Sequence, residues 1–167
     1  MRQENPADRI RRLVEAYQTP LLRMCYMQLG DRQLAEDAVQ ETFCKAYQGL
    51  GRFRGECSEK TWLMKIALNT CRDAQRSAWF RHVNRKISLE MLPEEGVEEK
   101  EEETALTQAI WKLPAKLRSV VLLYYYQGMS VREIAQAEGI SQPAVSGRLS
   151  RARVQLAKTL KGGHFDE

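Results

Sequence analysis

Residues 130–153 read SVREIAQAEGISQPAVSGRLSRAR, and this stretch contains the local signals that determine the fold around it. Ser130 and Glu133 have the S-x-x-E spacing of a capping box, which predicts the start of a helix. Gly139 predicts a tight turn that needs a positive φ. Ser141 then predicts the N-cap of a second helix, in whose first turn a proline is tolerated. A short helix, a glycine turn and a second helix form the helix–turn–helix pattern.

The second helix of this pattern is basic, with no acidic residue from Gln142 through Leu160. Ile134, Ile140 and Val145 would form a small core between the two helices. Ala135 is small at the point where they would cross. Such a helix suits the DNA major groove, because its first turns can meet base edges while flanking cations meet phosphates. A solvated, arginine-rich face is the alternative, but capping box, turn glycine and basic helix together favour DNA binding.

Charge is distributed in three blocks around this motif. Residues 1–87 contain 16 lysines and arginines against 10 acids, and residues 105–167 contain nine against four. Residues 88–104, between them, contain one lysine against eight glutamates. Basic surfaces favour polyanionic partners. We therefore expect two small domains, with boundaries at 1–87 and 105–167, joined by an acidic linker that is extended or flexible when free.

The whole chain shows helical periodicity and no sustained strand alternation, so the expected fold class is all-α, with two small helical bundles. Three glycines within residues 49–58 predict a loop. Thr19 and Pro20 leave open whether the first helix is one kinked helix or two. We expect helices over Pro6–Leu29, Arg32–Gly49, Glu59–Phe80 and Ala105–Trp111, and from near Pro114 to Gly128, ahead of the helix–turn–helix.

Two polar faces in the N-terminal half have spacings that place their residues together on a helix. Asp37, Gln40 and Glu41 form an acidic–amide patch at i, i+3 and i+4. A second stripe could follow a nucleic-acid backbone next to Phe53, Trp79 and Phe80, which could hold an unstacked base. For both faces, a solvated surface without a binding role is as well supported as a binding surface. Trp62 lies on the apolar stripe of its helix and is expected in the core. The second stripe consists of Lys65, Asn69, Arg72, Asp73 and Arg76.

Several function classes are disfavoured by what the sequence lacks. No apolar run approaches the roughly 20 residues of a membrane span, and the N-terminus has no secretory apolar core, so we expect a cytoplasmic protein without membrane insertion. No nucleophile–base pair or phosphate-binding glycine loop points to an enzyme, and no cofactor or metal site is expected. Reduced, buried thiols are favoured over a redox or metal role for the cysteines. These are Cys25, Cys44, Cys57 and Cys71.

Three motifs in order, LGDRQLAEDAVQETFCKAY, FRGECSEKTWLMKIALNTCRD and LPAKLRSVVLLYYYQGMSVREIAQAEGISQPAVSGRLSRAR, resemble the extracytoplasmic-function (ECF, group 4) sigma factors of bacterial RNA polymerase. The resemblance covers residues 9–160. It implies a region 2-like domain over 1–87 that binds core polymerase and the −10 element. It also implies a region 4-like domain over 105–167 that reads the −35 element, with 88–104 as the linker.

The resemblance assigns expected roles to individual residues. The Asp37 patch would dock on the coiled coil of the polymerase β′ subunit, and the second domain would meet the β flap. Many members have lysine or arginine followed by serine at the positions of Ser146 and Gly147. We therefore expect this protein to recognise a −35 sequence that differs from theirs. The residues expected to bind polymerase are Asp37, Gln40, Glu41 and Lys45. Those expected to bind the −10 element are Phe53, Arg54, Gly55, Lys65, Asn69, Arg72 and Arg76. Those expected to bind the −35 element are Ser141, Gln142, Ser146, Arg148, Ser150, Arg151 and Arg153.

The implied function is that of a non-catalytic initiation factor that binds core polymerase, recognises a promoter and helps to open it. A cognate anti-sigma factor is a further partner that the family implies. One rival is a dimeric helix–turn–helix regulator, which would bind a two-fold DNA site without polymerase. A second rival is a sigma mimic that occupies an anti-sigma protein, but it would not need a basic recognition helix.

Overall fold

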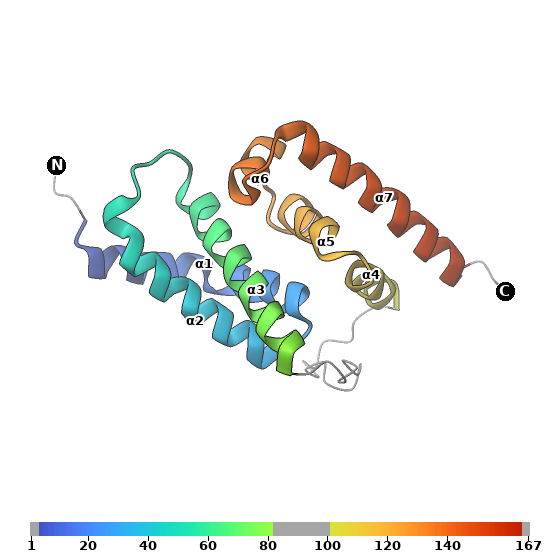
Figure 1. Cartoon of the computed structure of the whole chain (residues 1–167), viewed down its shortest axis with the longest axis horizontal. Helices are drawn as coiled ribbons and strands as arrows, with labels where there is room; N and C mark the ends of the chain where they lie inside the picture. The colour runs from blue at the N-terminus through green and yellow to red at the C-terminus, as the bar shows by residue number, and fades with distance from the viewer. Residues whose placement is uncertain (1–3, 82–100, 165–167) are drawn as a thin grey trace.

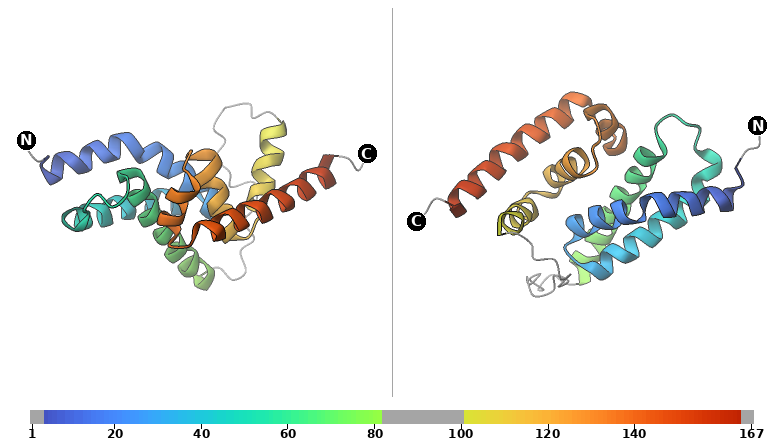
Figure 2. Two further views of the ribbon diagram at one scale, coloured as in Figure 1. Left: turned by 90° about the horizontal axis from the view of Figure 1, so that it is seen from above. Right: turned by 180° about the vertical axis from the view of Figure 1, so that it is seen from behind.

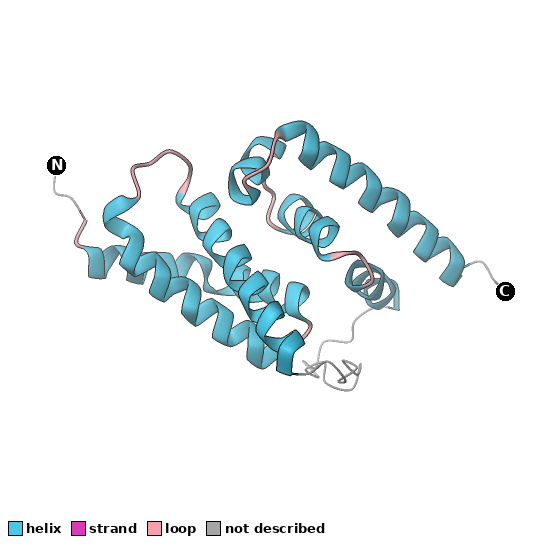
Figure 3. Ribbon diagram, in the orientation of Figure 1, coloured by secondary structure: helices cyan, strands magenta, loops and turns pink. Residues whose placement is uncertain are grey.

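The computed structural model describes residues 4–81 and 101–164, and within these ranges all regular structure is helical (Figure 3). The helices form two groups that lie side by side, with the two termini at opposite ends (Figure 1). The view from behind in Figure 2 shows the same two groups. The all-α expectation, with two helical bundles, is therefore confirmed.

The first group contains three helices that pack against one another. They are α1 (Pro6–Leu29), α2 (Arg32–Gly49) and α3 (Glu59–Arg81), and the 3-10 turn Leu50–Arg52 follows α2. Gly30 ends α1 at a φ of 68°, and the Asp31 side chain then accepts from the Leu34 amide at 2.9 Å to begin α2.

The α1 helix is a single helix that continues through Pro20. The sequence left open whether it would be one kinked helix or two. A proline removes one backbone hydrogen bond from a helix interior. Packing offsets that loss, because Leu21, Met24 and Cys25 directly after it are all buried in the core.

The second group contains α4 (Glu101–Trp111), α5 (Ala115–Val121), the π-helical turn Leu122–Tyr126, α6 (Val131–Glu138) and α7 (Gln142–His164). Both signals of the helix–turn–helix are present. Ser130 and Glu133 form the reciprocal capping box, and Gly139 ends α6 at a φ of 69°. Ile134 and Val145 are fully buried between α6 and α7, as expected.

The two groups share a continuous apolar core. One cluster of buried residues contains Leu21, Met64 and Leu68 from the first group and Val120 and Ile134 from the second. Helix α3 packs against α6, and α1 packs against α5 and the π-helical turn. We call this contact between the groups the seam.

The structure differs from the sequence expectation around the acidic strip. Helix α4 begins at Glu101 and not at Ala105, so the last four residues of the strip are helical. The remainder of the expected linker, residues 88–100, lies outside the described residues. The helix expected from Pro114 to Gly128 changes to a π-helical turn at Leu122, a feature that is common at functional sites.

The cysteines are less uniformly buried than the sequence suggested. Cys25 on α1 and Cys71 on α3 are buried, but Cys44 is exposed and Cys57 is half-buried. A hydrogen bond with Cys71, together with burial, raises the pKa of the Cys25 thiol. Within residues 4–81 and 101–164, no helix has the length and apolarity that crossing a bilayer requires.

Candidate nucleic-acid interface

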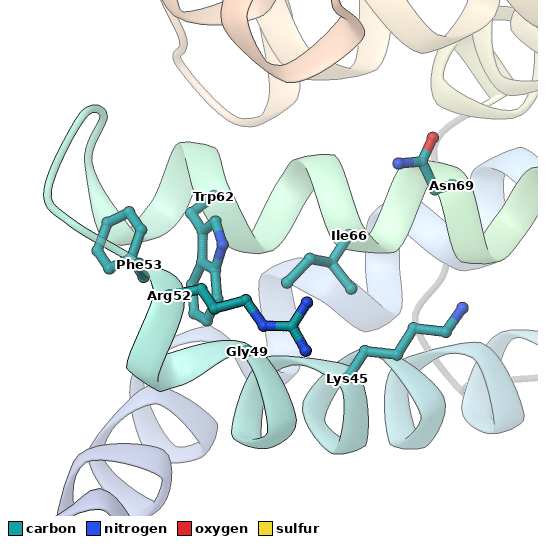
Figure 4. A pocket seen from close by; sticks show the side chains of 7 residues that line it. All are labelled: Lys45, Gly49, Arg52, Phe53, Trp62, Ile66 and Asn69. Carbon is teal, nitrogen blue, oxygen red and sulfur yellow. The ribbon is translucent and has the colours of Figure 1, made fainter.

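A pocket of about 450 Å³ opens between the C-terminal end of α2 and the first half of α3. Figure 4 shows Phe53 and Trp62 at one end of it and Lys45 and Asn69 at the other, with Arg52 extended along its mouth. Its walls combine aromatic faces with side chains that donate hydrogen bonds. This combination suits a planar, polar group such as an unstacked nucleobase. The lining residues are Lys45, Gly49, Arg52, Phe53, Trp62, Ile66 and Asn69.

The Phe53 ring is held by contacts from two helices. It stacks on Trp62 of α3 with ring centroids 4.7 Å apart and an interplanar angle of 23°. The Arg9 guanidinium of α1 lies 5.4 Å from the centroid of the same ring. Glu59 accepts from Arg9 at 3.1 Å and from Arg12 at 2.9 Å, which fixes the direction of Arg9. The aromatic end of the pocket is therefore preorganised.

These ion pairs shift the titration of the carboxylate. The hydrogen bond from Arg12, followed by that from Arg9, holds the pKa of Glu59 below its usual value, although burial acts in the opposite direction. A negative charge on Glu59 therefore persists at neutral pH beside the pocket. It serves to position Arg9 and Arg12 and is not directed at Phe53.

The loop between α2 and α3 contains the other two residues that were expected to contact the −10 element. Arg54 is exposed, and Gly55 has a φ of 75°, a region that favours glycine. Neither residue lines the pocket. Both lie beside it in sequence, directly after Phe53.

The polar stripe on α3 is confirmed as one helix face, but its members differ in their surroundings. Lys65, Asn69 and Arg76 are exposed. Arg72 is different, because its guanidinium contacts Asn69 at 3.2 Å and also forms an ion pair with Glu138 of α6. One of the cations expected to bind DNA is therefore already paired with the other half of the molecule. The side chains at 79 and 80, expected as aromatic neighbours of this stripe, lie outside the described residues.

The acidic–amide patch on α2 is open. Asp37, Gln40 and Glu41 are all exposed, and Gln33 donates to Asp37 from one turn earlier at 3.0 Å. Lys45 lies between this patch and the pocket: its ammonium group is 4.0 Å from the Glu41 carboxylate, donates to Thr70 of α3 at 3.2 Å and lines the pocket. The structure thus brings Lys45 together with the residues expected to contact the −10 element.

The second helix of the helix–turn–helix, α7, presents a long polar face to solvent. Ser141 at its N-cap and Gln142, Ser146, Ser150 and Arg151 along it are exposed, and Arg148 is half-buried. Arg153 is exposed as well, but it donates to the Tyr125 hydroxyl at 2.7 Å and lies near the Tyr124 and Tyr125 rings. The π-helical turn therefore orients the last arginine of the face.

Sequence reasoning missed part of the pocket. Trp62 was expected in the core, but it is half-buried and stacks on Phe53. Arg52 and Ile66 also line the pocket, and Arg9 supports it from α1. The aromatic at position 62, one helical turn after the glycine-rich loop, was the signal that could have located this wall.

Comparisons with known proteins agree with this geometry. The model "Sigma-70 region 2" matches residues 13–81, and the model "Sigma-70, region 4" matches residues 103–156. The RNA polymerase sigma-H factor of Pseudomonas aeruginosa is 32% identical, over 89% of this chain and 84% of that protein. The ECF RNA polymerase sigma factor SigW of Bacillus subtilis is 30% identical, over 89% of this chain and 87% of that protein.

Two solved structures share the arrangement of helices. CnrH, in complex with the cytosolic domain of CnrY, superposes with a TM-score of 0.71 at 27% identity, over 92% of this chain and 88% of that one. The sigma factor RpoE of Bartonella quintana, in complex with the anti-sigma factor NepR, gives a TM-score of 0.77 over 94% and 98%, and at 22% identity it supports the fold alone. On these grounds the chain belongs to the ECF family of RNA polymerase sigma factors, which initiate transcription by bringing core polymerase to promoters.

Proposed function

We propose that this sigma factor binds core RNA polymerase through the α2 patch, reads the −10 element at the α3 pocket and reads the −35 element with α7. The observation that carries the proposal is the pocket itself. It combines a preorganised aromatic pair, Phe53 and Trp62, with three donor side chains in a space of about 450 Å³. A flipped base needs such contacts to offset the few kcal/mol lost on unstacking.

The polymerase-docking role for Asp37, Gln40 and Glu41 is supported by their exposure on one face of α2. An acidic–amide surface complements basic and polar groups on a partner and sets orientation and association rate. Lys45 adjoins both surfaces. It pairs with Glu41 of the docking patch, and because it also lines the pocket beside Asn69, it would contact the −10 strand as well.

The −35 role for α7 is supported by its acid-free, exposed polar face. Arg151 is exposed and can form a bidentate contact with guanine. Arg153 is tied to Tyr125 and is better placed for a backbone phosphate, since its donors are partly used. Ser146 and Gly147 offer no long cation, and this predicts a −35 sequence unlike that of members with lysine or arginine there.

The domain division is also proposed, with residues 1–87 as region 2, 88–104 as the linker and 105–167 as region 4. The separate matches of two family models support it. We further propose a cytoplasmic location, because the partners are polymerase and promoter DNA. An anti-sigma factor is the expected further partner, like NepR in the complex of the RpoE protein to which this chain is similar.

Run-off transcription tests the proposal. The purified protein and core polymerase are mixed with a library of bacterial promoters, and we expect RNA chains that begin at a defined set of sites. Asn69→Ala should reduce transcripts by lowering −10 recognition while leaving polymerase binding intact. Absence of any start site in the presence of polymerase would refute the function, and unchanged transcription by the variant would refute the pocket assignment.

A further inference from the structure

The polar side chains around the pocket are almost all hydrogen-bond donors. The Lys45 ammonium group and the Arg52 guanidinium carry N–H groups and no acceptor, and the Trp62 indole nitrogen can only donate. No acidic side chain is among the seven lining residues, all of which lie in the described part of the chain. The hydrogen-bonding character of the pocket therefore depends on Asn69, the one lining side chain that has both a donor and an acceptor.

The orientation of the Asn69 amide is set by its neighbour on α3. Arg72, one helical turn later, donates to the Asn69 side-chain oxygen at 3.2 Å. Because a guanidinium has no acceptor, the amide can only turn its oxygen toward Arg72. The amide nitrogen is then left for the pocket. Figure 4 shows this nitrogen directed toward Ile66 and Trp62 and the oxygen directed away from them.

The acceptors close to the pocket are engaged or lie outside it. The backbone carbonyl of Gly49, which lines the pocket, accepts from the Phe53 amide at 3.2 Å. The Glu41 and Asp73 carboxylates lie 4.0 Å and 3.9 Å from the Lys45 ammonium group, but neither residue lines the pocket. A base that enters the pocket would therefore meet N–H groups beside a pair of stacked rings.

A set of donors distinguishes the four bases by the acceptors that each base presents. Guanine, thymine and cytosine each have a carbonyl oxygen, whereas adenine has none and carries an amino group at its 6-position. In this pocket, that amino group would place N–H groups against N–H groups. A confined polar group without a partner costs the free energy of its lost solvation, and a site built on hydrogen bonds rejects an analogue that cannot form them.

We propose that the pocket selects a carbonyl-bearing base of the −10 strand and rejects adenine, with Asn69 as the specificity-determining residue and Arg72 as the residue that holds its amide in the donating orientation. This inference rests on the proposed role of the pocket in −10 reading. Donor groups also suit a backbone phosphate, but the stacked Phe53 and Trp62 rings favour a planar base. A phosphate would bind equally well whichever base is attached to it.

The test uses the full chain bound to core RNA polymerase and a fluorescent DNA probe. The probe is a fork-junction DNA from a promoter found by run-off transcription, with its −10 non-template strand single-stranded. Each −10 position in turn carries adenine or hypoxanthine. These purines have nearly the same shape, but hypoxanthine has a carbonyl oxygen where adenine has its amino group. Fluorescence anisotropy gives the affinity for each probe, and core polymerase alone gives the background.

The expected result is one position at which hypoxanthine binds about tenfold more tightly than adenine. In Asn69→Asp, Arg72 would hold one carboxylate oxygen and the other would face the pocket as an acceptor, so the preference should fall by at least about fivefold at that position alone. Gln48→Glu is the charge-matched control, because Gln48 is exposed next to Gly49 and does not line the pocket. It should retain the preference. Circular dichroism checks that both variants are folded.

The outcomes separate this inference from the proposed function. If the probe binds but no position of the unmodified protein's complex prefers hypoxanthine, base selection by donors is wrong, a phosphate contact replaces it and the promoter assignment stands. This arm needs no variant, so it holds even if Asn69→Asp misfolds. If folded Asn69→Asp keeps the preference, or Gln48→Glu loses it equally, Asn69 does not select the base. If no −10 probe binds above background, the promoter assignment fails and this inference fails with it.

Discussion

The exposed face of α2 and the polar face of α3 have similar sequence patterns but opposite situations in the structure. The α2 patch of Asp37, Gln40 and Glu41 is exposed and open to a partner. The α3 face is partly covered by α6, with Arg72 held by Glu138. The spacing of polar residues along a helix therefore predicts that they share one face, but it does not predict whether that face is free to bind a partner.

This difference also affects the two proposed contacts. Under the proposed assignment, polymerase would dock on α2 with the two helical groups in contact, because Asp37, Gln40 and Glu41 are exposed in this arrangement. On α3, by contrast, the proposed −10 strand would meet an Arg72 that is already paired with Glu138.

The largest effect is expected on the open face. Asp37→Arg and Glu41→Arg should each weaken binding to core polymerase by about 2–4 kcal/mol, because a reversed charge would face basic partner groups. Isothermal titration with core enzyme measures this, and Glu15→Arg on α1 is the matched control. Unchanged affinity, with a native circular dichroism signal, would show that α2 is only a solvated face.

A larger side chain at a buried position of α6 should disturb the packing of this helix, which covers part of the α3 face. Ala135 of α6 is 9% exposed and belongs to the same apolar core as Val145 of α7, so leucine there would overpack the core. We expect Ala135→Leu to destabilise the protein by about 1–3 kcal/mol in urea unfolding. Gln136→Leu, which places the same side chain at the next, exposed position of α6, is the control. A native unfolding midpoint for Ala135→Leu would contradict the packing of α6.

The polar face of α7 is exposed, like the α2 patch, and is predicted to be free to bind DNA. Arg151→Ala should weaken binding to the cognate −35 duplex by about 1–3 kcal/mol if Arg151 forms a bidentate base contact. Anisotropy titrations with cognate and scrambled duplexes distinguish base from phosphate contact. Equal losses on both duplexes would assign Arg151 to a phosphate.

The smallest effect on binding is expected at the aromatic end of the pocket, where Phe53 stacks on Trp62 of α3. Arg9→Ala removes the cation beside Phe53, and we expect −10 strand affinity to fall by about 0.5–1 kcal/mol through looser positioning of the ring. Arg11→Ala, on the exposed face of the same helix, is the control. Polymerase binding should not change. If Arg9→Ala binds the strand as tightly as the wild type, Phe53 does not need this support.

Local structure could be predicted well from the sequence, because its causes are local. The bounds of α1 and α2 match the expectation, since Gly30 and Asp31 are strong end and start signals. The capping box at Ser130 and the left-handed Gly139 were likewise predicted. Such features depend on neighbours within about four residues.

The features that escaped prediction depend on distant residues. Arg72 and Glu138 are 66 positions apart, and neither residue type nor helical period in one sequence shows that they meet. Trp62 fits the apolar stripe equally well as a core residue or as a pocket wall, and only its stacking on Phe53 decides between them. The π-helical turn at Leu122 has the composition of an ordinary helix.

The unequal burial of the cysteines has a practical consequence for labelling. Cys44, which is exposed on α2, should react with a maleimide dye in the native protein, whereas Cys25 and Cys71 are enclosed between α1 and α3. Because thiolates are the reactive form, the raised pKa of Cys25 slows its alkylation further. Mass spectrometry of timed alkylation would therefore follow the separation of α1 from α3 without any engineered probe.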